Sequence, residues 1–98
     1  MLVKIHKSCR MCVAVCDSEL IDKKFEEGDR QLDLTGTFFK GEEKSTEEAR
    51  KILVHARAED ATFNFVGEKS VDIAKELSIA KDSGIIKIQD VPVALVLL

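Results

Sequence analysis

The stretch MCVAVC, residues 11–16, decides how this chain can fold. Its six residues are all apolar, and the small side chains of Cys12, Ala14 and Cys16 alternate with two valines. An apolar run without polar alternation predicts a central strand that is covered on both faces. Because the cysteine and alanine side chains are small, we expect a helix to pack closely on the face that they form.

Patterns on either side of this strand predict the remaining elements. Alternation or apolar runs predict further strands over residues 2–6, 30–35, 61–66, 85–89 and 93–98. The last run is continuously apolar, which indicates an interior strand. A short helical turn is expected within 17–25, and the segment 36–44 reads as a loop or an edge piece.

Two longer helices are predicted after these strands. Ser45 and Glu48 have the spacing of a capping box at the start of the first, over residues 46–57. Its apolar stripe follows at helical spacing: Ala49, Ile52, Leu53 and Ala56. The second helix is expected over 68–80, with Gly84 close behind it for a cap or turn.

The order of these elements is β-β-(short α)-β-α-β-α-β-β, with hairpins opening and closing the chain. Residues 1–98 are therefore expected to form one α+β domain, a mixed β-sheet with two principal helices. Its 98 residues are enough for a self-supporting core.

Composition narrows the function classes. The chain has 15 basic and 18 acidic residues and a formal charge of −3, which opposes general attraction to nucleic acid or to an anionic membrane but leaves room for a local basic patch. The N-terminus lacks the pattern of a signal peptide, and the apolar run at 91–98 is much shorter than a membrane helix. We expect a cytoplasmic protein with free thiols.

Three cysteines and a histidine follow one another as His6-x2-Cys9-x2-Cys12-x3-Cys16. Four such ligands suffice for zinc, and the spacing also suggests an iron–sulfur cluster with an outside ligand. In a strand, however, the Cα atoms of Cys12 and Cys16 stand about 13 Å apart, too far to share an ion or a disulfide. We expect these two to be structural thiols and no cofactor to be bound. A disulfide or a shared metal at Cys9 and Cys12 stays open.

The sequence shows no P-loop, no dinucleotide fingerprint and no nucleophile–base pair. The junction at Gly67, between a predicted strand and helix, resembles an anion-binding turn, because helix N-termini present free amides. Glu68 opposes an anion there. A tight turn at Gly67 is the favoured interpretation, and anion binding is the weaker one.

Two groups of residues are candidates for an interaction surface. Phe38 and Phe39 lie in a glycine-bracketed loop before Lys40. If one ring reaches the core, the other is exposed, and exposed aromatic residues are enriched at interfaces. The first predicted helix adds three basic side chains away from its apolar stripe: Arg50, Lys51 and Arg57.

Four motifs occur in a fixed order along the chain: VAVCD (13–17), FFKGE (38–42), NFVGEKSV (64–71) and VP (91–92). Together they resemble the small archaeal proteins grouped as domain of unknown function 424. The resemblance spans essentially the whole chain. It implies a single-domain, cytosolic archaeal protein without an assigned activity.

Departures from the family pattern bear on the candidate residues. The family has a tyrosine at the place of Phe39 and often a histidine at the place of Val93, so neither side chain is available here for chemistry. The pattern includes the pair Cys16-Asp17 and does not include Cys9 or Cys12. The resemblance therefore weakens the metal interpretation.

The sequence predicts a non-enzymatic interaction module whose partner is a protein, an RNA or a ribosomal component. A link to translation or RNA metabolism is one interpretation. The alternative is a metal-binding or thiol-redox protein that uses Cys9, Cys12 and Cys16. We expect no DNA or membrane partner, and the oligomeric state stays open.

Overall fold

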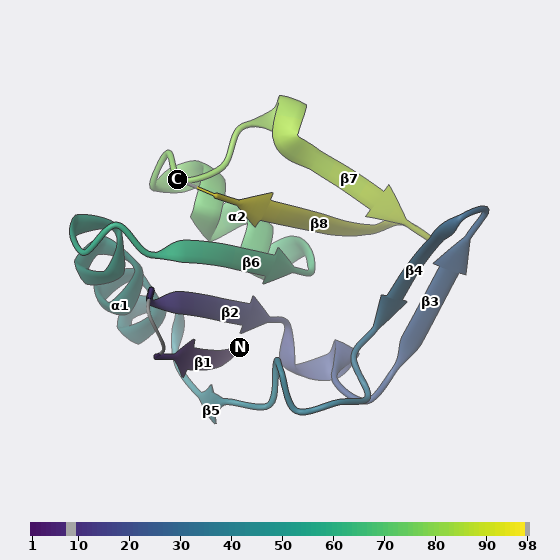
Figure 1. Cartoon of the computed structure of the whole chain (residues 1–98), viewed down its shortest axis with the longest axis horizontal. Coiled ribbons are helices and arrows are strands. Elements are labelled where there is room, and N and C mark those ends of the chain that lie inside the picture. Colours follow the sequence, from purple (N-terminus) through teal and green to yellow (C-terminus); the bar gives the residue numbers. More distant parts are fainter. Residues whose placement is uncertain (8–9, 98) are drawn as a thin grey trace.

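The computed structural model describes residues 1–7 and 10–97 (Figure 1). Six strands form one sheet in the order β5-β1-β2-β6-β8-β7, and two more form a separate hairpin. The strands are β1 (Leu2–His6), β2 (Cys12–Cys16), β3 (Lys24–Glu27), β4 (Arg30–Asp33), β5 (Glu42–Glu43), β6 (Thr62–Val66), β7 (Ile85–Ile88) and β8 (Val91–Val96). The helices are α1 (Thr46–Ala58) and α2 (Glu68–Glu76), with short 3-10 turns η1 (Ser18–Leu20) and η2 (Asp82–Gly84).

The sheet is mixed. β2 and β6 run parallel, and all its other strand pairs are antiparallel. Hairpins β1–β2 and β7–β8 stand at the two ends of the chain, as expected. The predicted α+β class, a mixed sheet with two principal helices, is confirmed.

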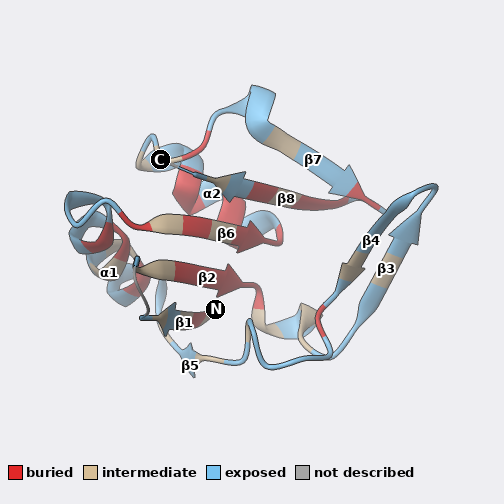
Figure 2. Cartoon of the chain, viewed as in Figure 1, coloured by how far each residue is buried: buried red, intermediate tan, exposed pale blue. Residues whose placement is uncertain are grey.

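Both helices pack on one face of the sheet, which we call the helix face (Figures 1 and 2). Alternation along β2 and β6 directs Val13, Val15, Phe63 and Phe65 to this side. They meet the apolar stripe of α1, whose Ala49, Leu53 and Ala56 are buried as predicted. Ser45 and Glu48 form the predicted capping box.

The opposite face, which we call the hairpin face, carries the side chains of Cys12, Ala14 and Cys16. The β3–β4 hairpin and its flanking segments cover one end of this face. There Cys16 and Val66 are buried in a second cluster with Leu34. The expectation that a helix packs on this face is wrong, because the larger valine and phenylalanine side chains already bind both helices to the other side.

Three predicted boundaries are also wrong. Residues 24–27 form strand β3, not part of a helical turn, because they pair with β4 around Gly28. Helix α2 ends at Glu76 instead of reaching residue 80, since Ser78 adopts φ 59°. Strand β8 starts before the proline and not after it. The Pro92 carbonyl still accepts a hydrogen bond from Gly67 N at 2.9 Å, just beyond the end of β6.

Candidate functional site

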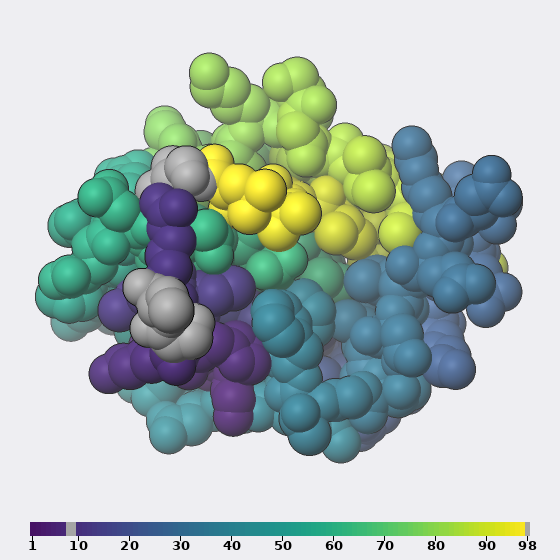
Figure 3. Space-filling view, in the orientation of Figure 1, coloured from purple at the N-terminus to yellow at the C-terminus, as the bar shows by residue number. Residues whose placement is uncertain are grey.

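Two rows of side chains cross the uncovered end of the hairpin face. Strand register places His6 beside Cys12 and Thr62, and Lys4 beside Ala14 and Asn64. Ala14 itself is fully buried. On β8, Leu95 pairs with Asn64, and Leu97 continues the alternation. We call the following side chains the open patch: His6, Cys12, Phe38, Asn64, Leu95 and Leu97. Figure 3 shows this side, with the end of β8 (yellow) at the surface beside the N-terminal segment (purple).

The two leucines are the most exposed members of the open patch. Leu95 is 57% exposed and Leu97 is 69% exposed. The predicted interior strand is confirmed in the strand order, since β8 lies between β6 and β7, but the burial expected of its run fails at Leu95 and Leu97. An all-apolar run contains no alternation that would have revealed which side chains face solvent, so the sequence analysis missed both residues.

Phe38 forms the border of the patch. Its ring stacks on the His6 imidazole, with centroids 4.4 Å apart, and stays 43% exposed. His6 Nε2 donates to the Phe38 carbonyl at 2.9 Å, which fixes the loop to β1. The Phe39 ring turns inward and packs against the second cluster. One ring is thus exposed and one is packed inside, as the paired phenylalanines suggested.

The glycine after this loop allows a close backbone approach. A Cβ atom on Gly41 would lie 2.6 Å from the Lys4 backbone nitrogen, closer than real side chains come. Lys40 forms an ion pair with Asp22 at 2.9 Å. This exposed pair orients the side chain and contributes little to stability.

The basic residues of α1 lie on the helix side of the sheet, away from Phe38. Arg50 makes a bidentate pair with Glu76 of α2 at 2.6 and 3.0 Å, which lowers the pKa of that carboxyl. Arg57 donates to the Leu77 carbonyl. Lys51 is exposed. The structure therefore does not bring the two predicted groups together into one surface.

The cysteine set is only partly visible, since Cys9 lies outside the described residues. Cys12 is partly exposed and Cys16 is buried, and each is a free thiol. Burial, with the nearby charges of Asp17 and Glu19, raises the pKa of Cys16 to about 12. Within residues 1–7 and 10–97, no three side chains of ligand type gather closely enough to hold a metal. His6 Nε2 carries the hydrogen that it donates to Phe38 and so offers no lone pair there.

The Gly67 junction binds an anion, but that anion is part of the chain. The buried carboxylate of Asp17 accepts from Lys69 N at 3.1 Å, Ser70 N at 2.8 Å and Ser70 Oγ at 2.7 Å. Asp17 thus caps α2 from the end of β2. A Cβ atom on Gly67 would lie 2.5 Å from Asp17 Oδ2. Glycine is required here for space as well as for its φ of 106°.

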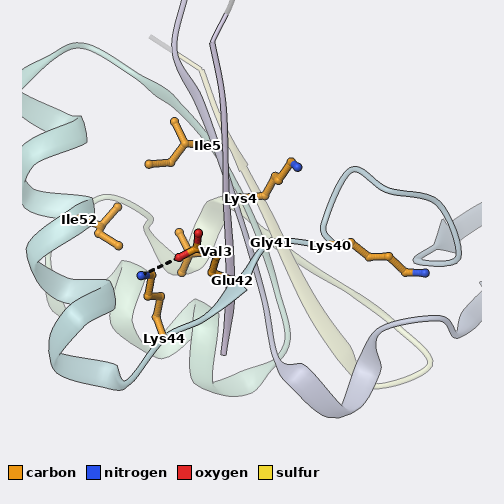
Figure 4. Close-up of a pocket in the computed structure, with 8 residues that line it drawn as sticks. All are labelled: Val3, Lys4, Ile5, Lys40, Gly41, Glu42, Lys44 and Ile52. Carbon is orange, nitrogen blue, oxygen red and sulfur yellow. Dashed lines mark ion pairs between the residues drawn. The ribbon is translucent and has the colours of Figure 1, made fainter.

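A cleft of about 520 Å³ lies beside the outer edge of β1 (Figure 4). Ile5, Ile52 and Lys44 lie on its helix side, where Lys44 forms an ion pair with Glu42 at 3.0 Å. Lys4 and Lys40 point away to the other side. Because the polar groups diverge, this cleft lacks the convergent set expected of a small-molecule site.

A solved structure shares this fold: the crystal structure of an uncharacterized conserved protein from Methanopyrus kandleri. The TM-score is 0.83 at 22% sequence identity, over 96% of this chain and 87% of that one. No curated protein matches the sequence. In the described part of the chain, no helix is long and apolar enough to cross a membrane. The family described as "Protein of unknown function (DUF424)" matches residues 6–98, so the chain belongs to the DUF424 family.

Proposed function

We propose that this protein is a non-enzymatic interaction module that binds a protein partner on the open patch. The observation that carries the proposal is the exposure of Leu95 and Leu97 on a sheet face with no helix over it in the described structure. Burying their exposed surface, somewhat more than one leucine side chain in total, contributes about 2–3 kcal/mol to binding. Phe38 adds an aromatic contact at the other end of the patch.

The composition of the patch favours protein over RNA. Bases stack on free aromatic faces, and here the stack of His6 on Phe38 already occupies one face of each ring. The two most exposed side chains of the patch, Leu95 and Leu97, are aliphatic, and the chain is acidic overall. A partner in the translation machinery fits this proposal when the contact is to a ribosomal protein or factor instead of to RNA.

A thiol or metal role for Cys9, Cys12 and Cys16 is the second candidate. The partial exposure of Cys12 favours it, because an accessible thiol at the end of a strand can react or bind a shared ion. Anaerobic purification with elemental analysis distinguishes the two. Stoichiometric zinc or iron that is lost in a C12S variant supports this role, and a metal-free protein whose three thiols all titrate after unfolding contradicts a stable metal site.

The main proposal is tested by affinity purification from a native cell extract, with and without ribonuclease. Leu95→Glu places a charge in the patch, and Val54→Glu is the matched control, since Val54 is 47% exposed on α1. We expect a protein that wild type and V54E recover, that L95E loses and that survives ribonuclease. Equal recovery by L95E and V54E contradicts the proposal. A partner that is no longer recovered after ribonuclease treatment would mean that the patch binds RNA and not protein.

A further inference from the structure

We propose that the segment bound on the open patch is an amphipathic helix whose apolar stripe is flanked by acidic residues. This inference rests on the proposed function and specifies the chemistry of the partner. Its observations are the side-chain character of the face, the dimensions of the exposed strip and the sign of the nearby charges.

The patch lies on a face of the sheet and not on an edge. Cys12 and Asn64 belong to strands β2 and β6, each paired on both sides, so their backbone groups already bond within the sheet. An extended peptide laid on this face would lose water from its own backbone groups without gaining partners. A helix satisfies its backbone internally and buries side chains alone.

The exposed strip has the dimensions of a short helix. It runs from β1 through β2 and β6 to β8, since β7 begins opposite Ala94 and does not reach Leu95. At about 4.8 Å per strand spacing, this is roughly 14 Å. The two rows of side chains stand about 7 Å apart along the strands. A helix about 10 Å wide with about ten residues in contact covers this strip.

The charges beside the patch are mainly basic. Lys4 is the one Lys, Arg, Asp or Glu on the hairpin face of the described strands β1, β2, β6 and β8. The β1–β2 connection adds Lys7 and Arg10, the latter donating from Nε to the Asp60 carbonyl. Asp60, in the neighbouring connection from α1 to β6, offsets part of this charge. Acidic residues beside the apolar stripe of a partner complement this arrangement.

The same charges disfavour a second copy of this chain as the occupant. A two-fold contact places each patch against its own copy, so the lysines and arginine of one copy approach those of the other. Like charges brought together at an interface lower affinity, whereas an acidic helix is attracted. The partner is therefore a different chain.

The test uses the rate of thiol labelling at Cys12, which lies inside the patch, in a C9S background. Cys16 does not interfere, because it is buried and its pKa is about 12. Three 16-residue peptides are compared: a helix with a leucine stripe and glutamate flanks, the same helix with lysine flanks, and a scrambled form of the first. Single-stranded RNA of similar length is a fourth probe.

We expect the acidic helix to slow the labelling of Cys12 about tenfold when it is present at about ten times its Kd, and L95E to remove this protection. Equal protection by the scrambled peptide contradicts the inference that the bound segment is an amphipathic helix, but still shows that the open patch binds a peptide. Protection by the helix with lysine flanks, and not by the one with glutamate flanks, contradicts the inference that the partner carries acidic residues beside its apolar stripe. No protection by any peptide at about 1 mM overturns the inference, whereas the extract experiment judges the proposed function separately. Protection by RNA alone overturns both.

Discussion

Cys12 and Cys16 lie on the same strand and the same face, yet they occupy different environments. Cys16 is fully buried under the β3–β4 hairpin, and its pKa is raised to about 12. Cys12 is partly exposed beside His6 and accepts a weak contact from Asn64 Nδ2 at 3.5 Å. The two ends of one sheet face therefore differ: the covered end belongs to the hydrophobic core, and the open end is exposed to solvent.

The largest expected effect on the covered end comes from a change at Gly67, where α2 meets Asp17. Gly67→Ala forces a methyl group against the Asp17 carboxylate at a φ of 106°. We expect a loss of at least about 3 kcal/mol in the free energy of unfolding, measured by urea denaturation. Gly84→Ala is the matched control, with open space around it. Equal stability of the two variants contradicts the role assigned to this junction.

Asp17 itself gives the next largest effect. In Asp17→Asn, the amide nitrogen takes the place of one oxygen and meets the Lys69 or Ser70 N–H, so one donor loses its acceptor. We expect a loss of about 2 kcal/mol, seen as a drop of roughly 8–16 °C in Tm. Asp22→Asn, at an exposed ion pair, is expected to change the stability by less than about 0.5 kcal/mol. A D17N protein as stable as D22N would show that the cap contributes little.

Local features could be predicted from the sequence, and long-range ones could not. The capping box of Ser45 and Glu48 is set within four residues, so spacing alone revealed it. The bonds of Asp17 to Lys69 and Ser70 join positions more than fifty residues apart, and no local pattern encodes them. The sequence favours a tight turn at Gly67 and gives anion binding as the weaker interpretation, and only the fold shows that an anion from the chain itself, Asp17, lies there.

The open patch illustrates a different limit. Phe38 stood out because it lies in a glycine-bracketed loop. Leu95 did not, since every residue of its run is apolar and the coverage of each face depends on where the hairpin folds. The expectation of a helix on the hairpin face failed for the same reason. Alternation along a strand defines two faces but does not say which of them a distant element covers.

The two cysteines also predict different responses to alkali. The pKa of Cys16 is about 12 in the folded chain, where burial and the charges of Asp17 and Glu19 raise it from the 9.0 of an unperturbed thiol. The contribution of the Cys16 thiol to the free energy of unfolding is therefore complete below pH 9. It declines as the pH rises from 9 to 12, because this thiol ionises in the unfolded chain before it ionises in the folded one. By pH 10 we expect wild type to lose about 1.4 kcal/mol more than Cys16→Val relative to pH 8. Urea denaturation at both pH values measures this, with Cys12→Val as the control. Identical slopes for wild type and C16V would mean that burial does not shift this thiol.

The smallest expected effect on stability comes from the open end. Leu95→Glu changes a side chain that is already 57% exposed, so we expect the free energy of unfolding to change by less than about 1 kcal/mol. Circular dichroism during urea denaturation measures it. A loss as large as that of D17N would place Leu95 in the core and remove the distinction between the two ends.

The most direct measurement of the central claim is the rate of Cys12 labelling in native extract, with Cys9 replaced by serine. The control variant carries Val54→Cys on α1 and has Cys9 and Cys12 replaced, and a filtrate without macromolecules corrects for small thiols. If a protein partner covers the open patch, Cys12 labels several-fold more slowly in whole extract than in filtrate, and the thiol introduced on α1 labels equally fast in both. Equal Cys12 rates in the two, or equal slowing at both positions, would contradict a binding surface on the open end of the sheet.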